Sequence, residues 1–484
     1  MFTPLKYLYG MDNTIFAETL AASDSANLAN DSKTHQTILA PVNEAYSESF
    51  ESQEVLNEIR YHFLDTPINL EKLKHNDLLT TKYTLKSLNG KAQKVKITKH
   101  GDKILLNNLI GIFPESGTPL LDPLNIVHSG NTVIYSLDSK LSPPGPLRPT
   151  TSEGLTLFRS FHHLVFSGLD QRIIFDETAI TALLPDDSAW KGMGLAEKYL
   201  LSDEAGDNLK KVMLSCILKG VHYSGDFSET ATDFETLSGE TVSLRADKNG
   251  LVFEDKGIKV ELTEKDILAS NGVGHSISSV PLPNSVIITP ENLINATGFK
   301  GWLNILQEHD LQSYLDINSN HTLLIPTDEA IHSASLNTLK PDIITSIINF
   351  HIIPPSKNGQ PVPDLFTSNP STIHTLSGTE LNIKQIYPSV WTIKTNSSST
   401  AARVLDQGKT SHGSQIVLID AVLFEQVVRK SSWAKIIAVV IFGVAMTVMV
   451  AAVVGWFVRW VQRRRETKPL FEDEERDPLL DGDE

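Results

Sequence analysis

The sequence predicts three tandem domains that each combine β-strands with α-helices, followed by one transmembrane helix. Two observations carry this prediction. The same ordered set of short motifs occurs three times in the chain. The stretch 436–457 then runs for 22 residues without a charged side chain, and a helix needs about 20 apolar residues to cross a bilayer. We expect the domains at 1–140, 153–284 and 288–428, and the membrane span at 436–458.

The first repeated motif is an apolar strand that ends at a proline. The three prolines, Pro41, Pro185 and Pro326, are 144 and 141 residues apart. An Asn or Asp follows two positions later, where it suits the cap of a following helix. A unit of this length is too long for a solenoid repeat, so each copy is expected to be a separate domain. The predicted capping residues are Asn43, Asp187 and Asp328.

Two further motifs follow each proline in the same order. One places His62, Cys216 or His351 at the end of an apolar passage. The other is a Leu-Asn-Gly or Leu-Ser-Gly turn that leads into strands of alternating polarity. Each copy then closes on an apolar strand. The Pro-rich segment 141–152 between the first two copies predicts a semi-rigid linker.

Together with the passage Asn271-Gly-Val-Gly-His275, these motifs resemble those of fasciclin (FAS1) domains. The resemblance covers nearly everything before the span. It implies an α+β fold, a wedge with a β-sandwich core and helices packed on it, in which the motif histidine is structural. The second copy departs from the pattern, because Cys216 stands where the family usually has histidine. The whole chain is similar to single-pass fasciclin-repeat proteins of the fungal vacuolar membrane.

Composition and motifs argue against several classes of function. The net charge of −16 disfavours nucleic-acid binding, which needs a basic face. Cys216 is the single cysteine, so no intramolecular disulfide can form, and its apolar neighbours predict a buried, inert thiol. His62 and His351 have no second ligand at metal spacing. Without a recognised catalytic or nucleotide-binding motif, we expect no enzymatic activity, no cofactor and no metal site.

The charge around the apolar stretch predicts its orientation. Arg459, Arg463, Arg464 and Arg465 follow the span, and positive side chains favour the cytosolic side. The acidic tail 459–484 is therefore expected in the cytosol, and the domains in a lumen or outside the cell. Sequons for N-glycosylation agree with this orientation. They begin at Asn30, Asn295, Asn320 and Asn396.

The tail contains Glu475, followed four residues later by Leu479 and Leu480, which fits the acidic dileucine pattern that clathrin adaptors recognise. The two leucines would enter an apolar pocket while the carboxylate meets basic residues. We expect adaptor-dependent sorting to a vacuolar or lysosome-like membrane. The alternative is an adhesion receptor at the cell surface that is endocytosed through the same motif.

Small side chains recur every four residues within the predicted span, along one stripe of the helix. A second helix could approach closely along such a stripe, so a homodimer through the span is a further hypothesis. The stripe consists of Gly443, Thr447, Ala451 and Gly455.

The first 16 residues contain no apolar segment and no cleavage site typical of a signal peptide. Because lumenal domains need a route across the membrane, we expect that the sequence is truncated at its start and that further domains precede it. An internal insertion signal is the alternative.

These expectations combine into a type I single-pass glycoprotein that acts in adhesion or binds a protein or glycan partner. This step rests on fold analogy. A lumenal hydrolase or carbohydrate-processing enzyme is the alternative from another functional class.

Overall fold

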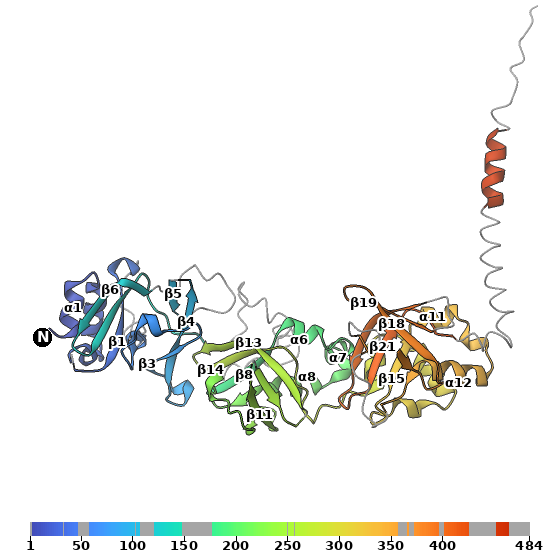
Figure 1. The fold of residues 1–484 in the computed structure, drawn as a ribbon, viewed down its shortest axis with the longest axis horizontal. Helices are drawn as coiled ribbons and strands as arrows, with labels where there is room; N and C mark the ends of the chain where they lie inside the picture. Colours follow the sequence, from blue (N-terminus) through green and yellow to red (C-terminus); the bar gives the residue numbers. More distant parts are fainter. Residues whose placement is uncertain are drawn as a thin grey trace, which may run out of the picture.

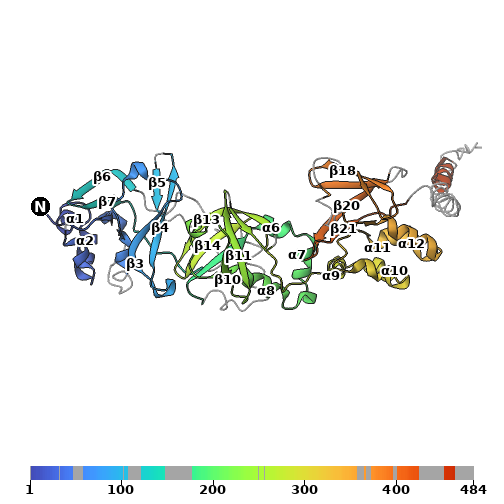
Figure 2. The same ribbon diagram turned by 60° about the horizontal axis from the view of Figure 1, so that its bottom comes forward.

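The structure is a computed structural model, and Figures 1 and 2 show three domains in a row along its longest axis, with the N-terminus at one end. The first domain is drawn in blue, the second in green and the third in yellow to orange. The structure describes residues 2–31, 33–46, 58–101, 103–106, 121–147, 177–248, 250–255, 257–356, 365–366, 372–395, 401–424 and 452–463.

The described part of the first domain has two short α-helices and a seven-stranded sheet. The helices are α1 (Pro4–Gly10) and α2 (Thr14–Ala22). They bury Leu8 and Phe16 against the sheet. The strands are β1 (Gln36–Pro41), β2 (Phe63–Leu64), β3 (Leu78–Thr84), β4 (Ala92–His100), β5 (Lys103–Leu106), β6 (Leu121–Ser129) and β7 (Thr132–Leu137).

The second domain also has a seven-stranded sheet. Its described helices are α6 (Asp187–Lys191), α7 (Leu195–Leu200) and α8 (Asn208–Ser215). Its strands are β8 (Ile180–Pro185), β9 (Ile217–Lys219), β10 (Thr232–Glu235), β11 (Thr241–Asp247), β12 (Gly250–Phe253), β13 (Ile258–Ala269) and β14 (Gly272–Ile277).

Within its described residues, the third domain places four α-helices before and beside a third seven-stranded sheet. The helices are α9 (Pro290–Asn295), α10 (Gly301–Glu308), α11 (Asp328–Ser333) and α12 (Pro341–Phe350). The strands are β15 (Thr322–Pro326), β16 (Ile352–Ile353), β17 (Thr372–His374), β18 (Glu380–Tyr387), β19 (Val390–Thr395), β20 (Ala402–Lys409) and β21 (Gln415–Ile419).

All three sheets share a central group of four strands. In the second domain its order is β9-β8-β14-β13, and β8 runs parallel to β14 while the other neighbours are antiparallel. The equivalent parallel pairs are β1 with β7 and β15 with β21. Each first strand of the pair ends at the predicted proline, which lacks an N–H for the ladder. The prediction of tandem domains built from sheets and helices is confirmed.

The sheet of the second domain curls until its two edges meet. Strand β13 belongs to both halves and carries register shifts between Leu262 and Ile267, which let a strand bend. An isolated bridge between Leu218 and Thr236 then joins β9 to β10 at the opposite edge. Side chains on the inner faces of the two halves form the apolar core of the domain.

The prediction that Asn43, Asp187 and Asp328 cap the helices after the prolines is wrong by one position. Asp186 and Thr327 are the N-caps, since their side chains accept hydrogen bonds from Ala189 and Ala330. Asn43 and Asp328 instead accept N–H groups at the start of an earlier helix. Asn43 Oδ1 receives Ile15 N–H at 3.0 Å, and Asp328 Oδ1 receives Gly301 N–H at 2.8 Å.

Among the residues that the structure describes, no helix has both the length and the apolar character that crossing a bilayer requires. Residues 436–451 of the predicted span 436–458 lie outside the described residues. Residues 452–463 are helical and are drawn in red in Figure 1.

Candidate functional site

The motif histidine makes the same buried hydrogen bond in the first and third domains. His62 Nε2 accepts the N–H of Leu141 at 3.2 Å, and His351 Nε2 accepts that of Leu423 at 3.0 Å. Leu141 and Leu423 each lie four residues after the last residue of the closing strand, β7 or β21. In these two domains the histidine therefore links the end of the domain to the helical turn that precedes its second strand.

Both rings are held neutral by their surroundings. Burial lowers the pKa of His351 from its ordinary 6.5 to about 4, and that of His62 to about 3. Each ring packs against an aromatic side chain, Phe16 beside His62 and Trp302 beside His351. A neutral ring with Nδ1 protonated leaves Nε2 free to accept, which matches the observed bonds.

The second domain lacks both partners of this bond. Cys216 occupies the histidine position, and the residue four places after the end of β14 is Pro281, which has no N–H. The missing acceptor is thus matched by a missing donor, since Pro281 offers no N–H that would need one. Cys216 is fully buried, and burial raises its pKa to about 12, so the thiol is not an activated nucleophile.

The joint between the first and second domains is built from hydrogen bonds to backbone carbonyls. Gln93 Nε2, on β4, donates to the Ala269 carbonyl at 2.8 Å, and Ser87 Oγ donates to that of Ser270. The Lys94 ammonium lies 3.7 Å from the ring centre of Tyr223. Apolar side chains from both domains, Leu88 and Val273 among them, form a buried cluster beside these bonds.

A buried charge also enters the second domain at this joint. Lys96, only 8% exposed, donates from Nζ to the Lys265 carbonyl. Burial lowers the pKa of Lys96, while Glu264 and Asp266 oppose that shift. Asp266 accepts both the N–H and the hydroxyl of Ser224 and lies 4.0 Å from His275. Removing the carboxylates would leave the Lys96 ammonium as an uncompensated buried charge, which is costly.

The predicted linker is docked rather than free over its described part. Leu141 is buried in the core of the first domain. The Leu147 N–H donates to Asn271 Oδ1 at 2.7 Å, and Ser270 N–H donates to the Gly145 carbonyl at 2.8 Å. Residues 141–147 therefore connect the two cores and restrict rotation between them.

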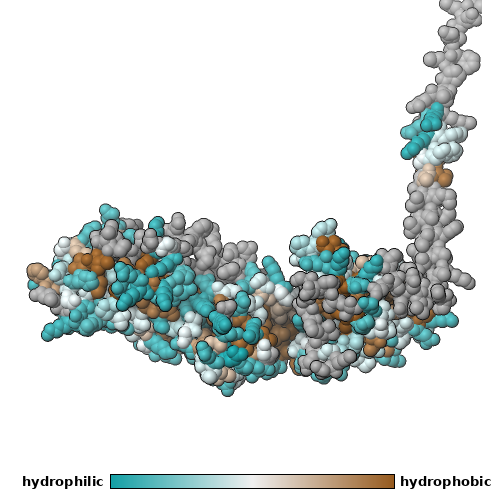
Figure 3. Space-filling model, viewed as in Figure 1, coloured by the Kyte–Doolittle hydropathy of each residue, from teal (hydrophilic) through white to brown (hydrophobic). Residues whose placement is uncertain are grey.

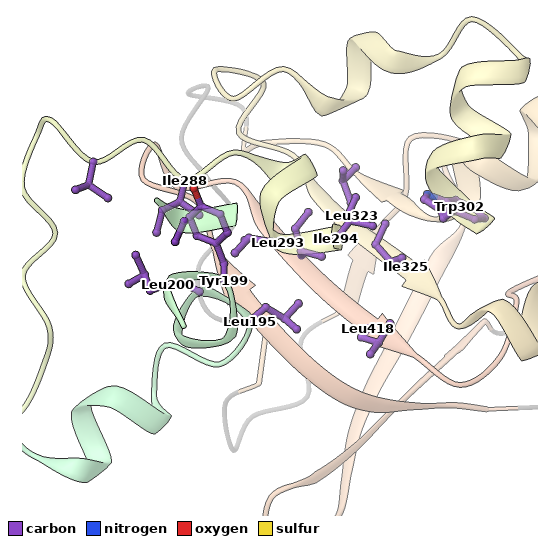
Figure 4. Packing of buried hydrophobic residues seen from close by; sticks show 14 of the residues in the cluster. Leu195, Tyr199, Leu200, Ile288, Leu293, Ile294, Trp302, Leu323, Ile325 and Leu418 are labelled. Carbon is purple, nitrogen blue, oxygen red and sulfur yellow. The ribbon is translucent and has the colours of Figure 1, made fainter. Parts of the chain in front are cut away.

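The joint between the second and third domains is a shared apolar core. Figure 4 shows Leu195, Tyr199 and Leu200 of α7 lying against Ile288 and the residues of α9. The same cluster continues through Leu293 and Ile294 to strands β15 and β21 of the third domain. Lys198 also pairs with Asp406 across the joint at 2.6 Å. Because the Lys198 side chain is 56% exposed, solvent screens this ion pair, and apolar burial holds the joint.

The face of the molecule in Figure 3 is mainly hydrophilic, with hydrophobic residues in separate patches rather than one continuous area. Among the described residues, no three metal-ligating side chains lie close enough to hold an ion.

A comparison with protein-family profiles matches the fasciclin domain three times, at residues 12–143, 157–283 and 297–425. The chain belongs to the fasciclin domain family. The three matches fall on the three sheets described above.

Curated fasciclin-domain relatives are distant in sequence. A FAS1 domain-containing protein of Saccharomyces cerevisiae is 26% identical over 455 residues, which is 87% of this chain and 49% of the relative. Human periostin is 23% identical over 72% of this chain and 40% of its own length. The chain thus spans about half or less of the length of these relatives.

Among solved structures, a FAS1 domain pair from the insect cell adhesion molecule fasciclin I matches 57% of this chain and 99% of its own. The sequence identity is 16% and the TM-score 0.30.

The predicted motif residues of the fasciclin domains fall into two groups in space. Pro41, Pro185 and Pro326 end the equivalent strands, and His62, Cys216 and His351 lie beside them. Asn271 instead belongs to the first joint, where it accepts the Leu147 N–H, and His275 lies buried inside the second domain. His275 Nε2 lies 2.9 Å from the His222 carbonyl, and Asn271 also donates to the Glu177 carbonyl at 3.1 Å.

The predicted glycosylation sites differ in exposure. Asn30 is exposed at the end of a 3₁₀ helix, whereas Asn295 and Asn320 are half-buried. Asn396 lies outside the described residues. So do Glu475, Leu479 and Leu480 of the sorting motif, and Gly443, Thr447 and Ala451 of the small-residue stripe. Gly455 lies in the described terminal helix.

Sequence reasoning missed the residues that form the joints. Lys96 and Gln93 carry no motif, and each acquires its role from a backbone carbonyl of the second domain. A signal was available for Asp266, a charged side chain directly before the apolar pair Ile267 and Leu268 in β13.

Proposed function

We propose that this chain is a membrane-anchored fasciclin protein that acts by recognition, holding a partner-binding surface at a fixed distance from a membrane. The observation that carries the proposal is the construction of the two joints. Hydrogen-bonded carbonyls and a buried lysine join the first pair of domains, and a shared apolar core joins the second pair. Three domains linked in this way act as one stiff rod, which suits adhesion or scaffolding.

The part of the proposal that concerns membrane anchoring and sorting rests on the sequence. Residues 436–458 provide the anchor, with the domains on the lumenal or outer side and the tail in the cytosol. Glu475, Leu479 and Leu480 direct sorting to a vacuolar or lysosome-like membrane through a clathrin adaptor. Residence at the cell surface, with endocytosis through the same leucines, is the second candidate, favoured by the general use of this motif in endocytosis.

Two measurements on tagged full-length protein test the proposal. Wild type should reside in the vacuole or lysosome, and Leu479→Ala with Leu480→Ala should move it to the cell surface. Burying two leucine side chains contributes on the order of 3–5 kcal/mol before ordering costs, so removing both should abolish adaptor binding. Leu470 lies in the same tail but outside the motif, and Leu470→Ala serves as the matched control.

Cells that display the double-leucine variant should aggregate, or attach to cells that lack the chain. Aggregation among expressing cells alone would indicate a second copy as partner, and attachment to other cells a different partner. A surface-displayed, correctly folded chain that promotes neither would overturn the recognition role.

A further inference from the structure

One peptide group of the second domain is bonded on both sides at the first joint. Its N–H, from Asp266, donates to His275 Nδ1 at 3.2 Å inside the second domain. The carbonyl of the same peptide group belongs to Lys265, and it accepts the ammonium of Lys96 from the first domain. Because a peptide group is planar and rigid, a change at the imidazole reaches the oxygen that binds the lysine. His275 is 0% exposed and Lys96 is 8% exposed, so solvent screens their charges only weakly.

The hydrogen bonds of His275 specify where its proton lies. Since Nδ1 accepts, Nε2 carries the hydrogen and donates to the His222 carbonyl at 2.9 Å. A second proton can enter only at Nδ1, where it removes the acceptor of the Asp266 N–H. The imidazolium would also attract the Asp266 carboxylate, whose Oδ1 lies 4.0 Å from Nδ1. That carboxylate is one of the two that stabilise the charge of Lys96.

The other two domains show that the fold does not require a histidine at this position. The register of the central parallel pairs aligns His275 with Tyr135 of the first domain and Val417 of the third. Tyr135 keeps one of the two bonds, because its hydroxyl donates to the Ile68 carbonyl at 3.1 Å. Ile68 is equivalent to His222, since the N–H of each donates to the threonine at the second position of β1 or β8. The second domain thus places a side chain that gains charge in acid where its siblings do not.

Charged and titratable groups face the ring from each described element that packs against it. Burial is the largest cause that lowers the pKa of His275, and Lys96 and Lys265 lower it further, so the ring is neutral at pH 7. Burial raises the pKa of Glu264, whose carboxylate therefore also loses its charge early in acid. Both changes leave the Lys96 ammonium less well compensated. The groups are Glu264, Lys265 and Asp266 of β13, Lys96 of β4, and His222, Tyr223 and Asp226 of the segment after β9.

We infer that the first joint is an acid-sensitive hinge, docked while His275 is neutral and released when its Nδ1 takes up a proton. In the docked state that proton leaves the Asp266 N–H without an acceptor and adds a buried cation beside the peptide group that Lys96 binds. In the undocked state Lys96 is in water, so the same proton costs less. Protonation and docking therefore oppose each other by one common factor. The inference goes beyond the recognition role and does not depend on it.

Single-molecule energy transfer in the full chain, held in detergent, measures the docked fraction. Fluorophores are attached to cysteines introduced at Asp24 and Glu229, which are exposed residues of the first and second domains. The native Cys216 is fully buried and stays unlabelled. Between pH 7.5 and pH 4.5 the ratio of docked to undocked chain should fall by about tenfold or more, which corresponds to about 1.4 kcal/mol. His275→Tyr introduces the residue of the first domain, which gains no proton in this range, and should keep nearly the same ratio at both pH values.

Glu264→Gln is the matched control, because it removes the other acid-titrating charge beside Lys96 and leaves the imidazole in place. It should lower the docked fraction at neutral pH and retain most of the loss in acid. A pH dependence that vanishes in Glu264→Gln but persists in His275→Tyr would make the carboxylate the sensor and overturn the inference. So would a wild-type docked fraction that is the same at both pH values.

A second measurement decides the question if His275→Tyr fails to fold. Titration of the His275 ring by NMR in the full chain should give a higher pKa in Lys96→Met than in wild type, because the lysine charge is removed and the joint is weakened. Equal pKa values in the two proteins would show that the ring and the joint are not coupled, and the inference would be wrong.

Discussion

At the scale of single residues, one buried hydrogen bond distinguishes the domains. His62 and His351 each accept a backbone N–H near the end of their domain. The second domain carries Cys216 and Pro281 instead, so it has neither acceptor nor donor. A buried N–H without a partner is costly, which explains why a proline accompanies the loss of the histidine.

The two positions should therefore be energetically coupled. His351→Cys leaves the Leu423 N–H buried without an acceptor and should destabilise the third domain by about 2–4 kcal/mol. Leu423→Pro removes that N–H together with a buried leucine side chain. The double variant should be less destabilised than the sum of the single ones, by about 1–2 kcal/mol. Chemical unfolding of all four proteins measures the coupling, and strict additivity would show that this bond does not link the two positions.

Burial of His351 should also make the third domain sensitive to acid. Its pKa falls from 6.5 to about 4 on folding, so between these values the unfolded chain binds more protons than the folded one. The stabilisation is complete above pH 6.5 and is lost as the pH falls toward 4. Between pH 7.5 and pH 5 the loss should be on the order of 2 kcal/mol. Unfolding at both pH values should show a smaller loss for His351→Cys than for wild type. Equal losses would contradict a buried neutral ring.

At the scale of secondary-structure elements, helix α7 decides how the second and third domains meet. It starts after Gly194, whose φ of +54° and ψ of −118° suit glycine alone. A Cβ at this position would overlap the Gln407 carbonyl oxygen of β20. A side chain on Gly408 would likewise meet Leu195 Cβ at 2.8 Å. Because neither glycine has a side chain, the backbone of α7 in the second domain can lie directly against the backbone of β20 in the third.

Gly194→Ala should open this joint. Gly206 offers a matched control, with φ of +52° and ψ of −125° but no atom within 4 Å of an added Cβ. Both alanine variants incur the same backbone strain, of about 1–3 kcal/mol, and only Gly194→Ala adds the clash with β20. Small-angle scattering should report a more flexible particle for Gly194→Ala and an unchanged one for Gly206→Ala. Identical profiles would show that the joint does not depend on this close approach.

At the scale of the whole molecule, the rod and its predicted anchor determine which surface a partner can reach. The sequence predicts that all three domains face the lumen or the exterior, where N-glycosylation takes place. Asn30 is the exposed sequon among those described, and it lies in the first domain, which stands at one end of the row of domains (Figure 1).

Endoglycosidase treatment should therefore increase the gel mobility of the membrane-bound protein. Asn30→Gln should remove much of that shift, because Asn295 and Asn320 are half-buried. Ser32→Ala removes the same sequon without changing the asparagine and should act in the same way. No shift for wild type, combined with protection of the tail from protease, would reverse the predicted orientation.

The sequence by itself determined the number of domains, their order and the strands that end at Pro41, Pro185 and Pro326. These features follow from local patterns that repeat three times, and periodicity and proline chemistry act over a few residues. It also indicated a buried Cys216, because the apolar neighbours that bury the thiol are adjacent in the chain.

Only the tertiary structure decided what each polar residue contacts. His62 and Leu141 are 79 residues apart, and Gln93 and Ala269 are 176 apart. The same holds for Asn43 and Asp328, which bind the start of an earlier helix, and for the lysine at the first joint, because their partners come close only after folding. Local patterns specify which backbone an amino acid prefers, but a hydrogen bond or cavity between distant segments exists only once packing has placed both of its sides.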